Sequence, residues 1–244
     1  MKLMGQGSVK KVVSSRVIGA SGKIGQSVSK YLALRSHQLF LHGGHNQESL
    51  KTLAESCRSH AKDVQTILLP FQNTTQFMKD FPQNIEPDIL VVCFGPWRRA
   101  SVEATTVADW TWLTDANLAL PGALVSKYGA GMAKRGFGRI ILFGSSSSDR
   151  IRPYTSIAAY AAAKTGLGVL AKSAAREWAS KGVTCNVVCP GYVEGSSGIS
   201  AEEIADSPLK IYQSPDNIAY IVDVLCQDKT IPVNGAIVSC GGGM

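Results

Sequence analysis

The chain has 244 residues, of which 45% are apolar and 18% are charged, and its formal net charge is +7. This length and apolar content are compatible with one large α/β domain, and no apolar run reaches the roughly 20 residues that a membrane helix needs. The basic residues are spread along the chain and accompany no nucleic-acid-binding motif, so we expect neither a nucleic acid nor a membrane as partner.

The six cysteines are scattered and form no Cys-x-x-Cys pair, a pattern that favours free thiols and provides no metal-ligand set. Residues 1–12 are polar and basic and lack the apolar core of a signal peptide, so we interpret them as the N-terminal extension of a cytoplasmic protein. Because no long polar linker follows, we expect residues 13–244 to form a single domain.

The first predicted strand, at 12–18, runs directly into a glycine-rich turn and a helix at 24–35. Glycines at such a junction let the backbone turn sharply, and they let a pyrophosphate approach the helix N-terminus, where free N–H groups favour anions. We therefore predict a dinucleotide-binding turn, with a purely structural glycine turn as the alternative. The candidate cofactor-binding residues here are Gly19, Ser21, Gly22, Lys23 and Ile24.

The second strand, at 38–41, ends in His42-Gly43-Gly44-His45. In a dinucleotide site an acidic residue near this strand end would bind the ribose 2′-hydroxyl, whereas a basic neighbour accommodates a 2′-phosphate. No carboxylate occurs here before Glu48, and Lys23 together with His42 or His45 would supply positive charge. The pattern favours NADP over NAD; the alternative is an exposed lysine and ordinary loop histidines.

Strands and helices alternate through the rest of the chain. We predict further strands at 64–69, 88–95, 138–145, 183–189 and 236–240, and helices at 47–60, before Pro82, at 107–135 with a bend near Pro121, at 157–180 and at 214–227. This order predicts a Rossmann-type, doubly wound parallel sheet of about seven strands with helices on both faces. Ligands of such sheets bind beyond the carboxyl ends of the strands, where Gly95 lies.

Two segments near that edge have the composition of site-forming loops. Arg98 and Arg99 follow Gly95 closely and could contact an anionic substrate, although exposed arginines are common on any surface. Residues 195–207 are small and polar, which is typical of a mobile loop or a lid over a site.

The predicted helix at 157–180 carries Tyr160 and Lys164, which lie four residues apart and therefore on one face. A phenol titrates near pH 10, and a fixed cation close by lowers its pKa toward 7, where it can donate a proton. The spacing alone occurs by chance in many chains. Two other polar features could form a site with this pair. One is Asn117, whose alternative interpretation is a buried amide with its hydrogen bonds satisfied. The other is the serine run Ser145 to Ser148 at a strand end, whose alternative interpretation is a polar turn.

In their order along the chain, these motifs resemble those of the short-chain dehydrogenase/reductase family, from about Val13 to Met244. The matching pieces are the glycine turn at 19–25, Ala116-Asn117-Leu118, the strand-end serine, Tyr160 with Lys164, and Pro190-Gly191. Within the family, three segments are similar to those of bacterial 3-oxoacyl-acyl-carrier-protein reductases: Gly138-Arg139-Ile140-Ile141, Asn186-Val187-Val188 and Ser214-Pro215.

The resemblance implies a role for each matching side chain. Tyr160 would donate a proton to the substrate carbonyl, Lys164 would lower the tyrosine pKa and bind the nicotinamide ribose, and Asn117 would hold a water that connects Lys164 to solvent. Strand-end alignment gives Ser145 as the residue that orients the carbonyl, whereas counting back from the tyrosine gives Ser147. We favour Ser145, because a rigid strand fixes its position. The other implied cofactor contacts are His42, Gly95, Tyr160, Lys164, Pro190, Gly191 and Val193.

The chain also departs from the family pattern around the cofactor. The second glycine of the turn comes one residue early, at Gly22, and Ile18 replaces a threonine. Further along, Pro70 stands where the family has an aspartate that binds the adenine, and Val92-Cys93-Phe94-Gly95 stands where it has Asn-Asn-Ala-Gly. Gly195, followed by Ser196, stands where the family has a threonine that binds the nicotinamide.

The sequence thus predicts an NADP-dependent carbonyl reductase or alcohol dehydrogenase that acts on a small-molecule or acyl-carrier-bound substrate. The resemblance also suggests a homotetramer that packs through the helices at 107–135 and 157–180. One alternative is a catalytically silent dinucleotide-binding sensor or partner protein, and another is an epimerase or dehydratase with a retained cofactor. The last ranks lowest, because the chain lacks the C-terminal substrate domain of larger members of that type.

Overall fold

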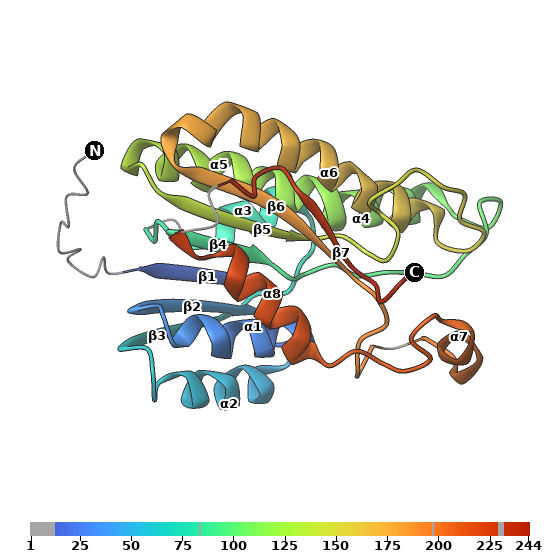
Figure 1. The fold of residues 1–244 in the computed structure, drawn as a ribbon, viewed down its shortest axis with the longest axis horizontal. Coiled ribbons are helices and arrows are strands. Elements are labelled where there is room, and N and C mark those ends of the chain that lie inside the picture. Colours follow the sequence, from blue (N-terminus) through green and yellow to red (C-terminus); the bar gives the residue numbers. More distant parts are fainter. Residues whose placement is uncertain (1–12, 83, 197, 229–231) are drawn as a thin grey trace, which may run out of the picture.

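The computed structural model describes residues 13–82, 84–196, 198–228 and 232–244, and the expected N-terminal extension at 1–12 lies outside them. Seven parallel strands form one sheet in the order β3-β2-β1-β4-β5-β6-β7, which confirms the predicted Rossmann-type fold (Figure 1). The strands are β1 (Ser14–Ile18), β2 (Gln38–Gly43), β3 (Asp63–Leu68), β4 (Ile89–Val92), β5 (Gly138–Phe143), β6 (Val183–Pro190) and β7 (Ile237–Cys240).

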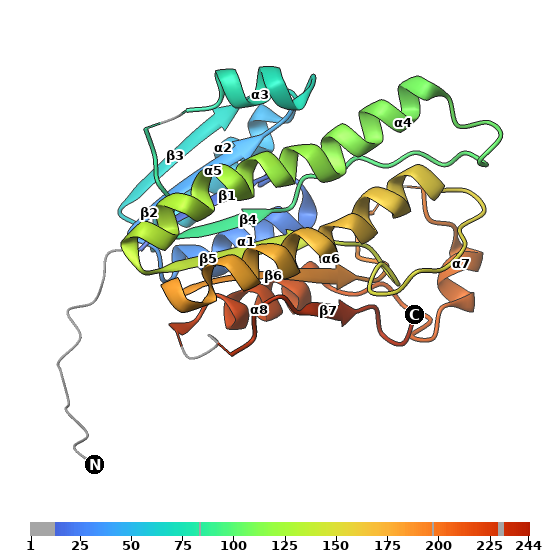
Figure 2. The same cartoon turned by 90° about the horizontal axis from the view of Figure 1, so that it is seen from above.

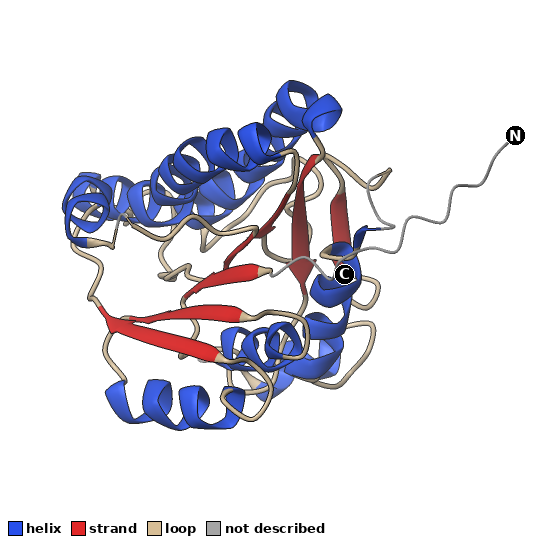
Figure 3. Cartoon of the chain, turned by 90° about the vertical axis from the view of Figure 1, so that its left-hand side faces the viewer, coloured by secondary structure: helices blue, strands red, loops and turns tan. Residues whose placement is uncertain are grey.

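Helices cover both faces of this sheet (Figures 2 and 3). One face packs against α1 (Lys23–Ala33), α2 (Gln47–Cys57) and α8 (Pro215–Leu225), and its core contains Leu32, Leu53 and Val222. The other face packs against α3 (Thr74–Asp80), α5 (Leu120–Arg135) and α6 (Ala158–Trp178), with α4 (Val107–Thr114) beside α6. The central strands β4 and β5 are buried along their whole length, as expected for parallel strands between two helical layers.

The carboxyl ends of the strands form one edge of the molecule. Parallel pairing sets Ile18 of β1 beside Val92 of β4, and Val92 in turn beside Leu142 of β5. The strand order reverses between β1 and β4, since β2 and β3 extend to one side and β5 to β7 to the other. In open α/β sheets a crevice for ligands forms at such a reversal, so the residues just after these strands are placed to build a site.

The long helix predicted at 107–135 is interrupted close to Pro121, as expected. A π-helical turn, Asp115–Ala119, separates α4 from α5, and Asn117 lies at its centre. Pro121 lies in the first turn of α5, directly after the π-turn, and because it has no N–H it cannot donate to a carbonyl of the preceding helical turn. The wider π-turn therefore marks the break, and single π-turns within helices are frequent at functional sites.

The segment predicted as a small polar loop, 195–207, contains the short helix α7 (Ala201–Asp206). Its first turn is stabilised by a capping box, in which the Ser200 side chain accepts from the Glu203 N–H and the Glu203 carboxylate accepts from the Ser200 N–H. Among the described helices, none combines the length and the apolar character that a membrane span requires.

Candidate active site

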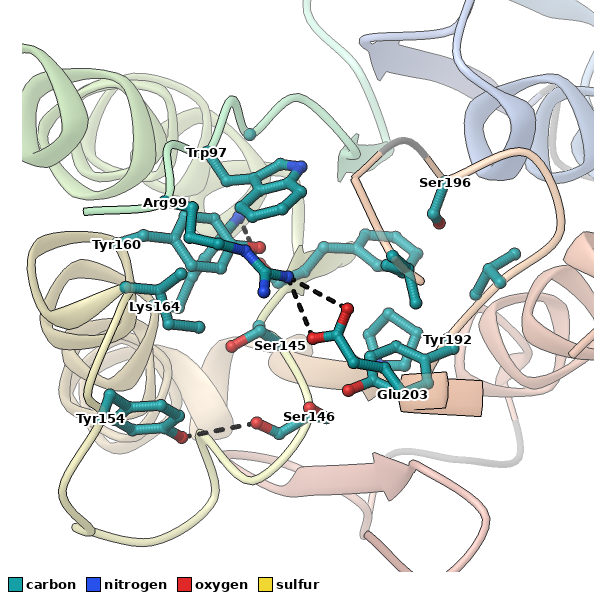
Figure 4. A pocket seen from close by; sticks show the side chains of 18 of the residues that line it. Trp97, Arg99, Ser145, Ser146, Tyr154, Tyr160, Lys164, Tyr192, Ser196 and Glu203 are labelled. Carbon is teal, nitrogen blue, oxygen red and sulfur yellow. Dashed lines mark hydrogen bonds and ion pairs between the residues drawn. The ribbon is translucent and has the colours of Figure 1, made fainter. Parts of the chain in front are cut away.

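A cavity of about 580 Å³ opens at the carboxyl edge of the sheet (Figure 4). Its walls come from the segments that follow β4, β5 and β6, from the first half of α6, and from α7. The predicted site residues that line it are Ile24, Gly95, Ser145, Tyr160, Lys164, Pro190, Gly191 and Val193. The other predicted residues, Gly19, Ser21, Gly22, Lys23, His42 and Asn117, lie outside its lining.

Tyr160 and Lys164 project from one face of α6 toward this cavity, as their spacing predicts (Figure 4). The Lys164 ammonium lies 5.6 Å from the centre of the Tyr160 ring and donates a hydrogen bond of 2.8 Å to the Phe143 carbonyl at the end of β5. Burial lowers the pKa of Lys164 to about 8, although the nearby Cys93 and Cys189 thiols oppose this change.

The pKa of Tyr160 moves in the direction opposite to the expected one. Burial raises the pKa of its phenol, and electrostatic interactions with Cys189 and Tyr154 raise it further. The Lys164 ammonium does not lower this pKa as expected, and it donates to the Phe143 carbonyl. The phenol therefore keeps its proton at neutral pH in this structure.

Asn117 lies behind Lys164, and Gly95 fits between the two. A Cβ atom built on Gly95 would lie 2.5 Å from Lys164 Nζ and 2.8 Å from Asn117 Oδ1, so only glycine fits without displacing them. The amide nitrogen of Asn117 donates to the carbonyls of Pro96 and Leu113, while its Oδ1 is buried without a hydrogen-bond partner. A buried acceptor of this kind near an ammonium is a suitable site for a bound water.

The two candidate serines occupy different places. Ser145 lines the cavity, and its buried Oγ has no hydrogen-bond partner, while its N–H donates to Ser148 Oγ at 2.9 Å. Ser147 has a left-handed backbone with φ of 60°, does not line the cavity, and faces an adjacent recess. The orphaned hydroxyl that shares the cavity with Tyr160 is thus that of Ser145, which is consistent with strand-end alignment.

The glycine turn is built for close approach between backbones. Gly19 has a φ of 81°, and a Cβ there would lie 2.7 Å from the Phe94 nitrogen, in the segment after β4. Gly22 precedes α1 in an extended conformation, and the first turn of α1 has neither a side-chain cap nor an acidic residue. The uncapped helix N-terminus therefore faces the crevice between β1 and β4, the arrangement that accepts a pyrophosphate.

His42 does not have the exposed position expected of a phosphate ligand. Its side chain is buried, its Nδ1 accepts from the Gly19 N–H at 3.2 Å, and its Nε2 lies 2.8 Å from the Leu69 carbonyl. Its ring also makes edge contacts with Phe77 and Phe81 of α3 and its C-terminal end. Burial lowers the pKa of His42 to about 4, so a neutral imidazole braces the glycine turn from below.

Lys23 begins α1, and its side chain lies beside the turn after β6. Its side-chain carbons lie about 3 Å from the Cβ position of Gly195, so a larger residue at 195 would displace the lysine. The exposed His45 is the basic residue next to the end of β2.

The cavity wall also contains residues that were not predicted as site residues, among them Trp97, Arg152, Tyr154, Tyr192 and Glu203. Arg99 bridges the cavity mouth, since its guanidinium donates to Glu203 of α7 at 3.0 and 3.2 Å and to the Gly198 carbonyl at 3.0 Å (Figure 4). The Arg99–Glu203 pair joins positions 104 residues apart, which no local pattern could reveal. The available sequence signal was the Trp97-Arg98-Arg99 run at a strand end.

In the described ranges, no group of three or more histidine, cysteine, aspartate or glutamate side chains is arranged to hold a metal ion. The cysteines of the sequence are free thiols in the structure, and four of them are buried: Cys57, Cys185, Cys189 and Cys226.

Comparison with known proteins places this architecture in a broad family. The model of the short chain dehydrogenase family matches residues 14–206. An acetoacetyl-CoA reductase of Allochromatium vinosum is 31% identical over 71% of this chain and 73% of its own length. A 3-oxoacyl-acyl-carrier-protein reductase of Staphylococcus aureus is 26% identical over 97% of this chain and 99% of its own. The crystal structure of a short-chain dehydrogenase/reductase family oxidoreductase from Burkholderia thailandensis matches with a TM-score of 0.81 and 27% identity, covering 96% of this chain and 92% of that one.

Proposed function

This chain belongs to the short-chain dehydrogenase/reductase family of oxidoreductases, and from that premise we propose that it reduces a ketone or 3-oxoacyl carbonyl to an alcohol with NADPH. The observation that carries the proposal is the shared cavity, in which the Tyr160 phenol, the unpartnered Ser145 hydroxyl and the Lys164 ammonium meet at the ends of β5 and α6. A hydrogen-bond donor, a proton donor and a fixed cation are what carbonyl reduction requires.

The residues around the crevice fit a nicotinamide dinucleotide. The glycine turn lets a pyrophosphate approach the uncapped start of α1, and Lys23 lies beside that path. Gly95, Pro190, Gly191 and Val193 line the cavity on the side where the nicotinamide would lie. When bound, the nicotinamide supplies the hydride that the protein itself cannot provide.

Each proton-handling step belongs to a residue of this chain. The Ser145 hydroxyl, which has no hydrogen-bond partner within the protein, donates a hydrogen bond to the substrate carbonyl. Tyr160, which keeps its proton at neutral pH, donates that proton to the carbonyl oxygen as negative charge develops there. The Lys164 ammonium stabilises the phenolate that results, and a water held by Asn117 Oδ1 connects Lys164 to solvent for reprotonation.

The preference for NADP over NAD rests on the end of β2. No carboxylate occurs there before Glu48, so the side chain that would bind a ribose 2′-hydroxyl and repel a 2′-phosphate is missing. His45 is exposed next to this strand end and replaces the buried His42 as the proposed basic neighbour. A Gly44→Asp variant tests this preference, because a Cβ at Gly44 would meet no atom within 4 Å. We expect the ratio of kcat/KM values to move from NADPH toward NADH.

The function is tested by replacing the proton donor. Tyr160→Phe should abolish the oxidation of NADPH across a panel of ketones and 3-oxoacyl thioesters, while calorimetry shows nearly unchanged NADPH binding. Tyr220→Phe is the matched control, since Tyr220 is exposed on α8 and does not line the cavity. Retained turnover in Tyr160→Phe would refute the assignment. Tight binding of NADPH by the wild type without turnover on any carbonyl would instead favour a silent dinucleotide-binding protein.

We also propose that the protein is a cytoplasmic homotetramer. The helices α4 and α6 pack against each other, and they leave apolar side chains exposed at Val107 (83%), Val169 (71%) and Trp112 (40%). Such exposed apolar groups on neighbouring helices support a contact with a second copy. Light scattering after size exclusion measures the assembly, and Val169→Glu should give a smaller species if this face is the interface.

A further inference from the structure

Arg152 connects the cavity to a second recess. It lies on the loop between β5 and α6, and it lines both the main cavity and an adjacent recess of about 290 Å³. Ser146, Tyr192 and Glu203 also line both spaces, so the two form one continuous groove that leads outward from Ser145 and Tyr160. A substrate whose carbonyl reacts at Tyr160 would extend its remaining part along this groove.

Arg152 is exposed, and its guanidinium lies over an aromatic ring. It lies 4.7 Å from the centre of the Tyr154 ring, and the Tyr154 hydroxyl donates at 3.4 Å to the Ser146 carbonyl (Figure 4). Stacking engages the face of a guanidinium and leaves the N–H groups of its edge free to donate. Arg152 thus presents hydrogen-bond donors in a defined place at the junction of cavity and recess.

The charge of Arg152 is not balanced by a carboxylate, in contrast to the charges of Arg98 and Arg99 in the segment after β4. Arg99 is paired with Glu203, and Arg98 is paired with Asp109. Among the described residues, no carboxylate forms an ion pair with Arg152, although Glu203 and Asp206 line the recess beside it. A guanidinium that lies over an aromatic ring, faces a ligand groove and has no anionic partner is suited to bind an anion through two parallel N–H···O hydrogen bonds.

We propose that Arg152 is a specificity-determining residue that binds a carboxylate or phosphate on the part of the substrate remote from the reacting carbonyl. The inference rests on the proposed carbonyl reduction and names a class for its substrate: carbonyl compounds with an anionic end. Arg99 is less suited to this task, because its charge is paired with Glu203 and its Nη2 already donates to Glu203 and to the Gly198 carbonyl. The Arg152 contact supplies binding energy and takes no part in proton transfer.

The test compares matched anionic and neutral substrates. One arm uses methyl ketones with a terminal carboxylate, from 4-oxopentanoate to 7-oxooctanoate, each paired with its methyl ester. The other arm pairs S-acetoacetyl phosphopantetheine with S-acetoacetyl pantetheine, which lacks the phosphate. Rates of NADPH oxidation are measured for the wild type, Arg152→Gln, Arg152→Lys and the control Arg150→Gln. Arg150 is exposed on the same loop and lines neither space.

We expect the wild type to prefer the anionic member in one arm by about tenfold in kcat/KM, since charged hydrogen bonds are stronger than neutral ones. The arm that shows the preference distinguishes a carboxylate from a phosphate. Arg152→Gln should remove the preference through KM, with kcat and the neutral substrate unchanged, whereas Arg152→Lys should retain part of it. Equal losses for both members of a pair, or no preference in either arm, would overturn the proposal.

A binding measurement separates this inference from the proposed function. The affinities of 4-hydroxypentanoate and of phosphopantetheine for the wild type and Arg152→Gln, each saturated with NADP, are measured by isothermal titration calorimetry. Weaker binding in Arg152→Gln but not in Arg150→Gln supports an anion site even if no carbonyl substrate is turned over, an outcome that would refute the proposed reduction. Equal affinities for both probes in all three proteins would refute the anion site.

Discussion

Replacement of Gly95 by alanine tests whether the arrangement of Lys164 and Asn117 controls the activity. The added Cβ would lie 2.5 Å from Lys164 Nζ, and ordinary contacts begin at 3.4 Å, so the ammonium must shift by about 0.9 Å. Such a shift breaks the 2.8 Å hydrogen bond to the Phe143 carbonyl and moves the charge away from Tyr160. A misplacement of about 1 Å can reduce a rate about 100-fold, which equals about 2.7 kcal/mol of transition-state stabilisation.

The assay is kcat/KM for NADPH-dependent reduction of the best substrate, measured together with the thermal midpoint of unfolding. The matched control is Gly122→Ala in α5, where a Cβ meets no atom within 4 Å. We expect Gly122→Ala to keep full activity and to gain about 0.5–1 kcal/mol of stability from helix propensity. If Gly95→Ala folds and retains wild-type kcat/KM, the position of Lys164 does not limit the reaction and our reasoning is wrong.

Three further outcomes follow from the site. Ser145→Ala should lower kcat by about 100-fold, because it removes the donor to the carbonyl oxygen, whereas Ser147→Ala should leave kcat unchanged; steady-state kinetics of both variants would expose the reverse assignment. The pH profile of kcat/KM should be flat at neutral pH and fall as pH rises through about 8, the lowered pKa of Lys164, because only the ammonium form is active; a rate that rises through this range contradicts the mechanism. Glu203→Gln should release Arg99 and open the cavity mouth, so trypsin should cleave after Lys210 faster than in the wild type. The increase should be up to about fivefold, because a partly exposed ion pair contributes about 0.2–1 kcal/mol. An unchanged cleavage rate would show that the pair does not hold α7.

Much of the fold was predictable because its determinants are local in sequence. Alternating apolar strands and helices require a parallel sheet with helices on both faces, and the glycines at 19–25 mark the turn between β1 and α1. The four-residue spacing of Tyr160 and Lys164 places both on one face of α6, since helical geometry depends only on neighbours along the chain. The helical content of 200–206 was missed, although Ser200 and Glu203 form the three-residue spacing of a capping box.

The sequence by itself thus determined the architecture, the strand ends at which a site forms, and the helix that carries Tyr160 and Lys164. Tertiary structure alone decided the surroundings of each side chain, because these depend on segments that are distant along the chain. The aromatic rings of Phe77 and Phe81 enclose His42 and turn a proposed phosphate ligand into a buried brace for the glycine turn. Packing of the loop after β5 places Ser145 in the wall of the cavity, with its hydroxyl buried and unpartnered, and places Ser147 at the adjacent recess. Burial raises the pKa of Tyr160, an effect that no spacing of residues could reveal.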